Sequence, residues 1–212
     1  ALQARIAAQP NTNRAKNVII LVADGNGVAT NLASRLWAGQ QAGGYGDDHV
    51  QAHEAFPHLG LAKTYNTNAQ TPDSAGTATA IMAGVKTKAG VIGVDETVKR
   101  GVCDGVVDGS VASIAEILSA QGKSVGLVST ARLTHATPSA AYAHSADRNF
   151  EDNSALPEGC EVNDIAAQLL DAMKAGTIDL AMGGGRRHFL PKDVTDEEGK
   201  GGKRTDGRNL VA

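Results

Sequence analysis

Three apolar runs along the chain predict buried β-strands. The strongest covers residues 17–23 (NVIILVA), a continuous stretch of aliphatic side chains typical of a central parallel strand covered on both faces. The runs at 124–129 (SVGLVS) and 178–182 (IDLAM) repeat the pattern. Polar or glycine-rich sequence follows each run, as expected where a strand enters a turn. We therefore expect three strands with turns at their carboxyl ends.

Helical sequences alternate with these runs. Residues 29–40 follow the first run, and residues 111–120 and 162–174 carry apolar side chains at helical spacing on one face. This alternation favours an α/β fold, with a doubly wound, mostly parallel sheet and helices on both faces. In such sheets ligands bind beyond the carboxyl ends of the strands. Polar residues at those ends are therefore the first candidates for a functional site.

Composition narrows the class of protein. The 212 residues are enough for one α/β domain and too few for two of ordinary size. A net charge of −3 predicts no general attraction to nucleic acid, and no apolar run reaches the length of a membrane span. The glycine-rich, charged segment 195–209 is expected to be an exposed loop. Cys103 and Cys160 fit either one disulfide in an exported protein or two buried thiols in a cytosolic one, and composition leaves both open.

Ser74 lies where a turn meets a helix-forming run. Pro72 and Asp73 form the turn, and the small residues after Ser74 favour a helix. Ser74 is therefore expected at a helix N-terminus, where unpaired backbone N–H groups and the helix dipole attract anions. Serine is also a common N-cap, and the motif alone favours that ordinary role. Asp24, directly after the first apolar run, is either a cation ligand or a helix cap by the same reasoning.

A second polar group follows the run at 124–129. His135 and Thr137 come shortly after the expected strand, and Arg148 lies further along. Arginine is suited to bidentate contacts with phosphate, although a lone surface arginine is usually only a solvated charge. Taken together with the residues above, the set combines a metal-binding carboxylate, a nucleophile and a phosphate clamp.

Four segments resemble the alkaline phosphatases in order and spacing. They are 17–27 (NVIILVADGNG), 71–80 (TPDSAGTATA), 134–144 (THATPSAAYAH) and 178–186 (IDLAMGGGR). The resemblance covers residues 16–212 and includes shorter matches such as 61–66 (LAKTYN). It implies an alkaline phosphatase-like fold in which residues 1–212 are the N-terminal portion of a single domain. We expect the natural protein to continue into a C-terminal half that carries the remaining metal ligands.

The resemblance implies a phosphomonoester hydrolase that uses two zinc ions (Zn²⁺) and one magnesium ion (Mg²⁺). Ser74 would be the nucleophile and would become a covalent phosphoserine. Arg148 would clamp two phosphate oxygens, and Asp73 would position Arg148. The implied substrate is a phosphate monoester, and the second product is inorganic phosphate.

The resemblance also implies metal ligands within this chain. Asp24 would bridge one zinc ion and the magnesium ion, and Ser74 would bind the same zinc ion. Thr137 would bind magnesium. His135 would lie near the magnesium site, at a position where some members of the family have aspartate and others histidine. With histidine there, the site could hold a further zinc ion.

Further expectations follow from the family. The protein would be exported, to the periplasm or outside the cell, and would form a homodimer, with Cys103 paired to Cys160. One alternative is a sulfatase or phosphodiesterase, although the segment 71–75 lacks a sulfatase motif and Asp73 with Arg148 favours a monoester. The other alternative is a non-catalytic fragment of the same fold that lacks a complete metal site.

The remaining histidines receive an ordinary interpretation. His49 and His53 have the spacing of a helical metal pair, but they match no ligand of the family and are expected on a solvated face. The same interpretation applies to His144 and His188. The glycines at 183–185 are expected to form a structural turn after a strand.

Overall fold

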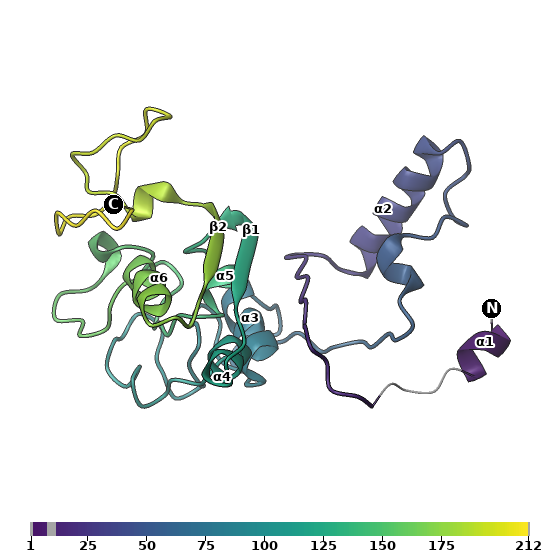
Figure 1. Ribbon diagram of the computed structural model, residues 1–212, viewed down its shortest axis with the longest axis horizontal. Helices are drawn as coiled ribbons and strands as arrows, with labels where there is room; N and C mark the ends of the chain where they lie inside the picture. The colour runs from purple at the N-terminus through teal and green to yellow at the C-terminus, as the bar shows by residue number, and fades with distance from the viewer. Residues whose placement is uncertain (1, 8–11, 212) are drawn as a thin grey trace. The chain divides into compact units, whose positions relative to one another are not determined.

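The computed structural model describes residues 2–7 and 12–211. The chain divides into two compact units, Ala1–Lys63 and Thr64–Ala212, and each is described by itself. Figure 1 traces the elements of both units along the chain. No helix formed by the described residues has the length and apolar character needed to cross a lipid bilayer.

The described part of the first unit is helical. It contains α1 (Leu2–Ala7), α2 (Val28–Gln41) and the 3-10 helix η1 (Ala52–Ala55). The helix predicted at 29–40 is confirmed as α2. Arg35 of α2 forms an ion pair with Glu54 of η1, with Nε 2.9 Å from Oε1, so this pair ties the two helices together.

The strand predicted at 17–23 is not formed. These residues pair with no strand among those the structure describes, and the Ile19 and Leu21 side chains are 84% and 85% exposed. An apolar run becomes a stable strand only where neighbouring strands supply hydrogen bonds and another layer covers its face. The high exposure shows that this covering is absent in the described chain, which is why the sequence pattern alone gave the wrong element.

The second unit holds a parallel pair of strands. β1 (Gly126–Arg132) and β2 (Leu180–Gly184) lie side by side (Figure 1), with Leu127 opposite Ala181. Leu127 and Ala181 pack against the hydrophobic core, whereas Val128, on the other face of the sheet, is exposed. Both strands predicted in this half of the chain are therefore confirmed, and so is the α/β class.

The second unit also contains several helices. They are α3 (Ser74–Ala83), α4 (Ile114–Ala120), α5 (Ala136–Ser139) and α6 (Ile165–Lys174), with the 3-10 helices η2 (Asn153–Ala155) and η3 (Arg186–His188). Two of them begin later than the apolar pattern predicted because Ser113 and Asp164 cap them. The Ser113 hydroxyl and the Asp164 carboxylate accept hydrogen bonds from backbone N–H groups in the first turns of α4 and α6. The helices pack through small side chains, mainly alanine, as the glycine- and alanine-rich composition indicates.

Cys103 and Cys160 are joined in a disulfide. This confirms the pairing implied by the family resemblance and excludes two free thiols. The bridge closes a loop across a sequence separation of 57. In the chain-entropy model a disulfide that closes a loop of this length stabilises the folded state by about 4 kcal/mol.

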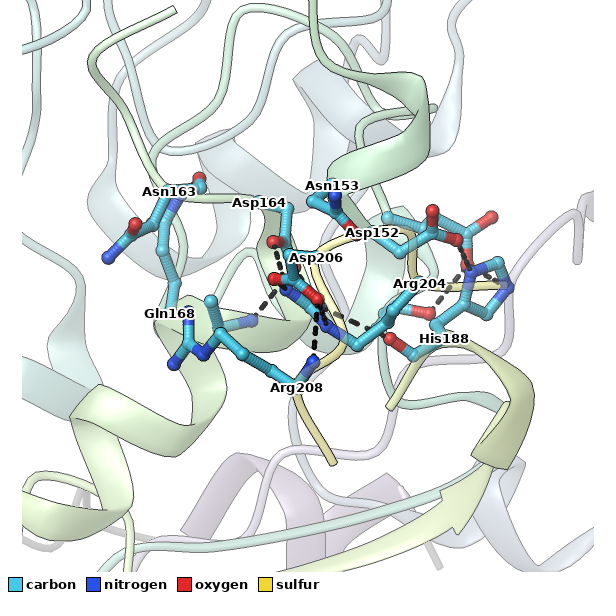
Figure 2. Close-up of polar contacts among 12 residues, drawn as sticks. Asp152, Asn153, Asn163, Asp164, Gln168, His188, Arg204, Asp206 and Arg208 are labelled. Atoms are coloured by element: carbon cyan, nitrogen blue, oxygen red, sulfur yellow. Dashed lines mark hydrogen bonds and ion pairs between the residues drawn. The ribbon is translucent and has the colours of Figure 1, made fainter. Parts of the chain in front are cut away.

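The segment 195–209 is not a fully solvated loop as predicted, because Arg204 anchors it. Arg204 is 1% exposed, and its guanidinium donates to both carboxylate oxygens of Asp164, at 2.9 and 3.0 Å. It also pairs with Asp206 (Figure 2). Since Asp164 is the N-cap of α6, the buried ion pair fastens the loop to the start of that helix.

Replacing Arg204 is expected to destabilise the second unit strongly. Arg204→Met would leave the buried Asp164 carboxylate without its cation, and breaking a buried pair in this way costs about 3–5 kcal/mol. Arg208→Met is the matched control, since Arg208 is exposed. Chemical denaturation followed by circular dichroism measures both. Equal unfolding free energies for the two variants would contradict the anchoring role of Arg204.

Candidate functional site

Ser74 is the first of the ten residues of α3. Asp73 precedes it in an extended conformation, and its Oδ1 accepts a hydrogen bond from the Gly76 N–H at 3.1 Å. Asp73 is therefore the N-cap, and the ordinary capping role considered for Ser74 is excluded. Ser74 is left in the first turn of the helix, where backbone N–H groups and the helix dipole favour an anion.

Arg148 meets this helix start from 75 residues further along the chain. Its Nη1 donates to Oδ2 of Asp73 at 3.1 Å, and its backbone N–H donates to the Gly90 carbonyl at 2.8 Å. The Gly90 N–H donates in turn to Oδ2 of Asp73 at 3.0 Å. Both the side chain and the backbone of Arg148 are thus fixed relative to Asp73.

The environment of Asp73 favours its charged form. Burial raises the pKa of this carboxyl group, but hydrogen bonds from the Gly76 N–H, Asn66, the Gly90 N–H and Arg148 outweigh burial, so the pKa lies below its usual value. The carboxylate is therefore ionised at neutral pH. In that form it is a strong acceptor for the guanidinium of Arg148.

His135 and Thr137 lie at the start of α5, shortly after β1. His135 is the N-cap residue of α5, and Thr137 lies within this short helix. Nε2 of His135 lies 3.0 Å from Nη2 of Arg148, and because a guanidinium can only donate, Nε2 is the acceptor. α5 packs against both β1 and α3. The structure therefore brings Asp73, Arg148 and His135 into contact beside the helix that begins with Ser74.

Asp24 lies in the first unit, in the turn that follows residues 17–23. The turn is closed by a hydrogen bond from the Asn26 N–H to the Ala23 carbonyl at 3.1 Å. Gly25 adopts φ +76°, a left-handed conformation that glycine accepts without strain. Because residues 17–23 form no strand, Asp24 does not lie at the carboxyl end of a strand as predicted. Its role as a metal ligand stays a prediction.

The described residues form no cluster of metal-binding side chains. Within 2–7 and 12–211, no three His, Cys, Asp or Glu side chains form a group that could hold a metal ion. The carboxylate of Asp24, the hydroxyls of Ser74 and Thr137 and the imidazole of His135 are donors of the kinds that magnesium and zinc accept. His53 is exposed, in keeping with the solvated face expected for it.

Two histidines expected on a solvated face are held inside the fold. Nδ1 of His144 lies 2.6 Å from the Gly93 carbonyl and Nε2 lies 3.2 Å from Glu116. Burial lowers the pKa of His144, but the contacts with Glu116 and Gly93 outweigh burial and the pKa is raised. His188 is 3% exposed, and its Nδ1 lies 2.6 Å from Oδ2 of Asp152 (Figure 2). The solvated interpretation was wrong because the partners of both rings lie far away in sequence.

Sequence reasoning also missed the acidic pair Glu151 and Asp152. Glu151 accepts hydrogen bonds from Nε of Arg132, at 2.8 Å, and from the Thr134 hydroxyl, at 2.5 Å. These contacts fix the segment after Arg148 to the carboxyl end of β1. The signal in the sequence was the pair of adjacent carboxylates three residues beyond Arg148.

The family model for alkaline phosphatase matches residues 15–212. The chain belongs to the alkaline phosphatase family. It is 47% identical to the tissue-nonspecific isozyme of Mus musculus over 212 residues, and 46% identical to the membrane-bound alkaline phosphatase of Bombyx mori over 210 residues. These matches cover 95% and 96% of this chain, but 40% and 38% of the relatives. The chain thus spans about 40% of the length of the curated alkaline phosphatases that it matches.

Solved alkaline phosphatases have the same fold. The alkaline phosphatase of the Antarctic bacterium TAB5 aligns with a TM-score of 0.61 at 26% identity, covering 89% of this chain and 42% of that one. The Thermus thermophilus enzyme aligns with a TM-score of 0.64 at 26% identity, covering 90% of this chain and 32% of that one. These likenesses confirm the alkaline phosphatase-like α/β fold.

The acidic pair predicts how stability changes in acid. Burial raises the pKa of Asp152, but hydrogen bonds from His188 and Ser154 outweigh burial and lower the pKa from 3.8 to about 2. A carboxyl group whose pKa is lower in the folded state stabilises the fold fully above about pH 4, and this contribution is lost as the pH falls toward 2. The expected loss is on the order of 2 kcal/mol.

Unfolding free energies measured between pH 2 and pH 6 test this expectation. Asp152→Asn should flatten that part of the pH dependence, whereas Asp104→Asn, at an exposed position, should preserve it. An unchanged slope in Asp152→Asn would show that other carboxyl groups carry the acid sensitivity.

Proposed function

We propose that the whole protein is a metal-dependent phosphomonoester hydrolase that works through a covalent phosphoserine at Ser74. The observation that carries the proposal is the ion pair between Asp73 and Arg148 at the start of α3. It puts a guanidinium, which can bind two phosphate oxygens, beside a serine in the first turn of a helix. The similarity to alkaline phosphatases over 95% of the chain supports the same reaction.

In this proposal each residue has a defined task. Oγ of Ser74 attacks phosphorus while the alcohol leaves, and water then attacks the phosphoserine and releases inorganic phosphate. Arg148 binds two of the phosphoryl oxygens and stabilises their charge in both transition states. Asp73 holds the guanidinium in place, so that little reorganisation is needed when the ester binds. When bound, two zinc ions and one magnesium ion lower the pKa of the serine hydroxyl and of the attacking water.

The ligands proposed within this chain are Asp24 and Ser74 for one zinc ion, and Asp24 with Thr137 for magnesium. His135 is proposed to lie near the magnesium position. A TAB5 alkaline phosphatase variant, which aligns with a TM-score of 0.62, is described with magnesium bound in its M3 site. The hydroxyl and carboxylate oxygens of Thr137 and Asp24 are the donors that magnesium prefers.

A second candidate function is a non-catalytic module of the same fold. It is favoured by one observation, that no three metal-binding side chains form a group among the residues the structure describes. Metal content and turnover of a chromogenic phosphate ester at alkaline pH, measured on the natural protein, separate the two candidates. Tightly bound zinc together with turnover would support the enzyme. The absence of both would support the non-catalytic module.

We also propose that the protein is exported and acts as a homodimer. The disulfide between Cys103 and Cys160 supports export, because disulfides persist in oxidising compartments and are rare in the cytosol. The homodimer is inferred from the family alone. Gel filtration with light scattering would decide it.

Ser74→Ala in the natural full-length protein is expected to reduce kcat by at least about 1,000-fold, because removing a nucleophile abolishes the covalent route. The amounts of zinc and magnesium bound by the variant should fall much less than kcat. Ser119→Ala is the matched control, since this hydroxyl donates to the Gly176 carbonyl away from the site. Acid-quenched protein incubated with a labelled ester should carry its label on Ser74. Label on another residue would refute the assignment.

Residues 1–212 expressed alone are expected to show no zinc-dependent turnover. A catalytic zinc ion needs about three protein ligands and an open position, and the proposed set provides only Asp24 and Ser74. Ester hydrolysis with added zinc and magnesium measures this. Robust turnover that disappears in Ser74→Ala would mean that local residues such as His49 and His53 had been wrongly dismissed.

A further inference from the structure

The two oxygens of the Asp73 carboxylate accept hydrogen bonds from different groups. Oδ2 accepts hydrogen bonds from Arg148 and from the Gly90 N–H. Oδ1 accepts one from the Gly76 N–H, at 3.1 Å, and one from Nδ2 of Asn66, at 2.9 Å. The plane of the carboxylate, and therefore the position that Oδ2 offers to Arg148, depends on what holds Oδ1.

Asn66 is built into the fold as a rigid donor. It is 3% exposed, and its backbone is locked in a tight turn by reciprocal hydrogen bonds with Ala69, at 2.9 and 3.2 Å. The next residue, Thr67, donates from its N–H to the Thr87 carbonyl at 3.0 Å. The turn is thus fastened on both sides, and the Asn66 side chain projects from a fixed backbone.

The helix start is shaped to receive this side chain. A Cβ placed on Gly76 would lie 2.8 Å from Oδ1 of Asn66 and 3.0 Å from the Lys88 carbonyl. Glycine at this position lets the asparagine pack directly against the backbone of α3. The same amide group therefore contacts the helix that carries Ser74 and the carboxylate that holds Arg148.

Carboxylate rotation makes the Asn66 contact consequential. The terminal torsion of an aspartate side chain is broad, and without Asn66 a single backbone donor, the Gly76 N–H, would hold Oδ1 opposite the Gly90 N–H on Oδ2. A second donor on Oδ1, from a different direction, restricts that rotation. Oδ2 is then held toward Gly90 and Arg148 before any phosphate binds.

We propose that Asn66 is a positioning residue for phosphate recognition, acting through Asp73 on the guanidinium of Arg148. The proposal deepens the function proposed above and rests on Arg148 binding phosphate. Asn66 itself touches neither Arg148 nor the reacting atoms. Its effect should therefore depend on the presence of Arg148.

The test uses the natural full-length protein loaded with its metals and compares four forms by calorimetry. They are wild type, Asn66→Asp, Arg148→Ala and the double variant, each titrated with inorganic phosphate. Asn66→Asp keeps the size of the side chain but replaces the amide donor with an acceptor facing Asp73. Misplacing a binding group by about 1 Å can cost up to about 100-fold, so we expect phosphate affinity to fall by about 10- to 100-fold.

The double variant distinguishes positioning from general damage. If Asn66 acts through Arg148, phosphate affinity in the double variant should equal that of Arg148→Ala, because the coupled residues share one effect. Multiplying effects would overturn the proposal. Asn68→Asp is the matched control in the same turn, since it keeps an acceptor for the Ala89 N–H and is exposed. Its phosphate affinity should stay within about twofold of wild type.

Folding and metal content are measured in every form. If Asn66→Asp melts below the temperature of the assay, Asn66→Ala replaces it, because this change removes the donor without burying a charge. A folded, metal-loaded Asn66 variant that binds phosphate as tightly as wild type would overturn the proposal.

Turnover of a phosphate ester keeps this test separate from that of the proposed function. Wild type that binds phosphate in an Asn66-dependent way without turnover would refute the enzyme and support the positioning role. If the wild type hydrolyses the ester but its phosphate affinity does not depend on Asn66, the result would support the enzyme and refute the positioning role.

Discussion

The site depends on one constraint: both oxygens of the half-buried Asp73 carboxylate must accept hydrogen bonds. Half-buried, it would be costly as an isolated charge. Its partners come from the helix start, from the turn around Asn66, from Gly90 and from Arg148, so meeting its hydrogen-bonding demand assembles segments that are distant in sequence. Capping α3 and placing the arginine beside Ser74 are therefore consequences of the same carboxylate. In the proposed function, the carboxylate that stabilises the fold is therefore also the group that positions Arg148 for phosphate binding.

The same rule governs the buried polar groups outside the site. Arg204 is accommodated because Asp164 and Asp206 surround its guanidinium, and His188 because Asp152 faces its ring. Each pair connects a loop to an element of regular structure. The segment that follows Arg148 is fixed to β1 through Glu151, so the framework around the candidate site is held by ionic contacts as well as by the small apolar core.

A feature could be predicted from the sequence where the interactions that form it join residues close together in the chain. The start of α3 was predictable because its turn and its small helical residues are neighbours in the chain, and β1 and β2 because each is a local apolar run. Residues 17–23 gave the strongest signal of the three, yet they form no strand, because strand pairing and coverage by another layer depend on other segments. Arg204 and His188 looked like surface residues for the same reason, since their partners Asp164 and Asp152 lie 40 and 36 residues away. Asn66 carries no local signal, and only the folded turn points its amide at Asp73.

The two units carry different parts of the proposed chemistry. The second unit brings together the helix start, Arg148 and its supporting residues, which are the groups proposed to recognise a phosphate dianion by hydrogen bonds and charge. Asp24, the carboxylate proposed to bridge metals, belongs to the first unit. In the proposed function, recognition of the phosphate group would rest on contacts already made within the second unit, whereas activation of the serine would also require metal ligands. Phosphate affinity and turnover would for this reason be separable, and a substitution that affects one need not affect the other to the same extent.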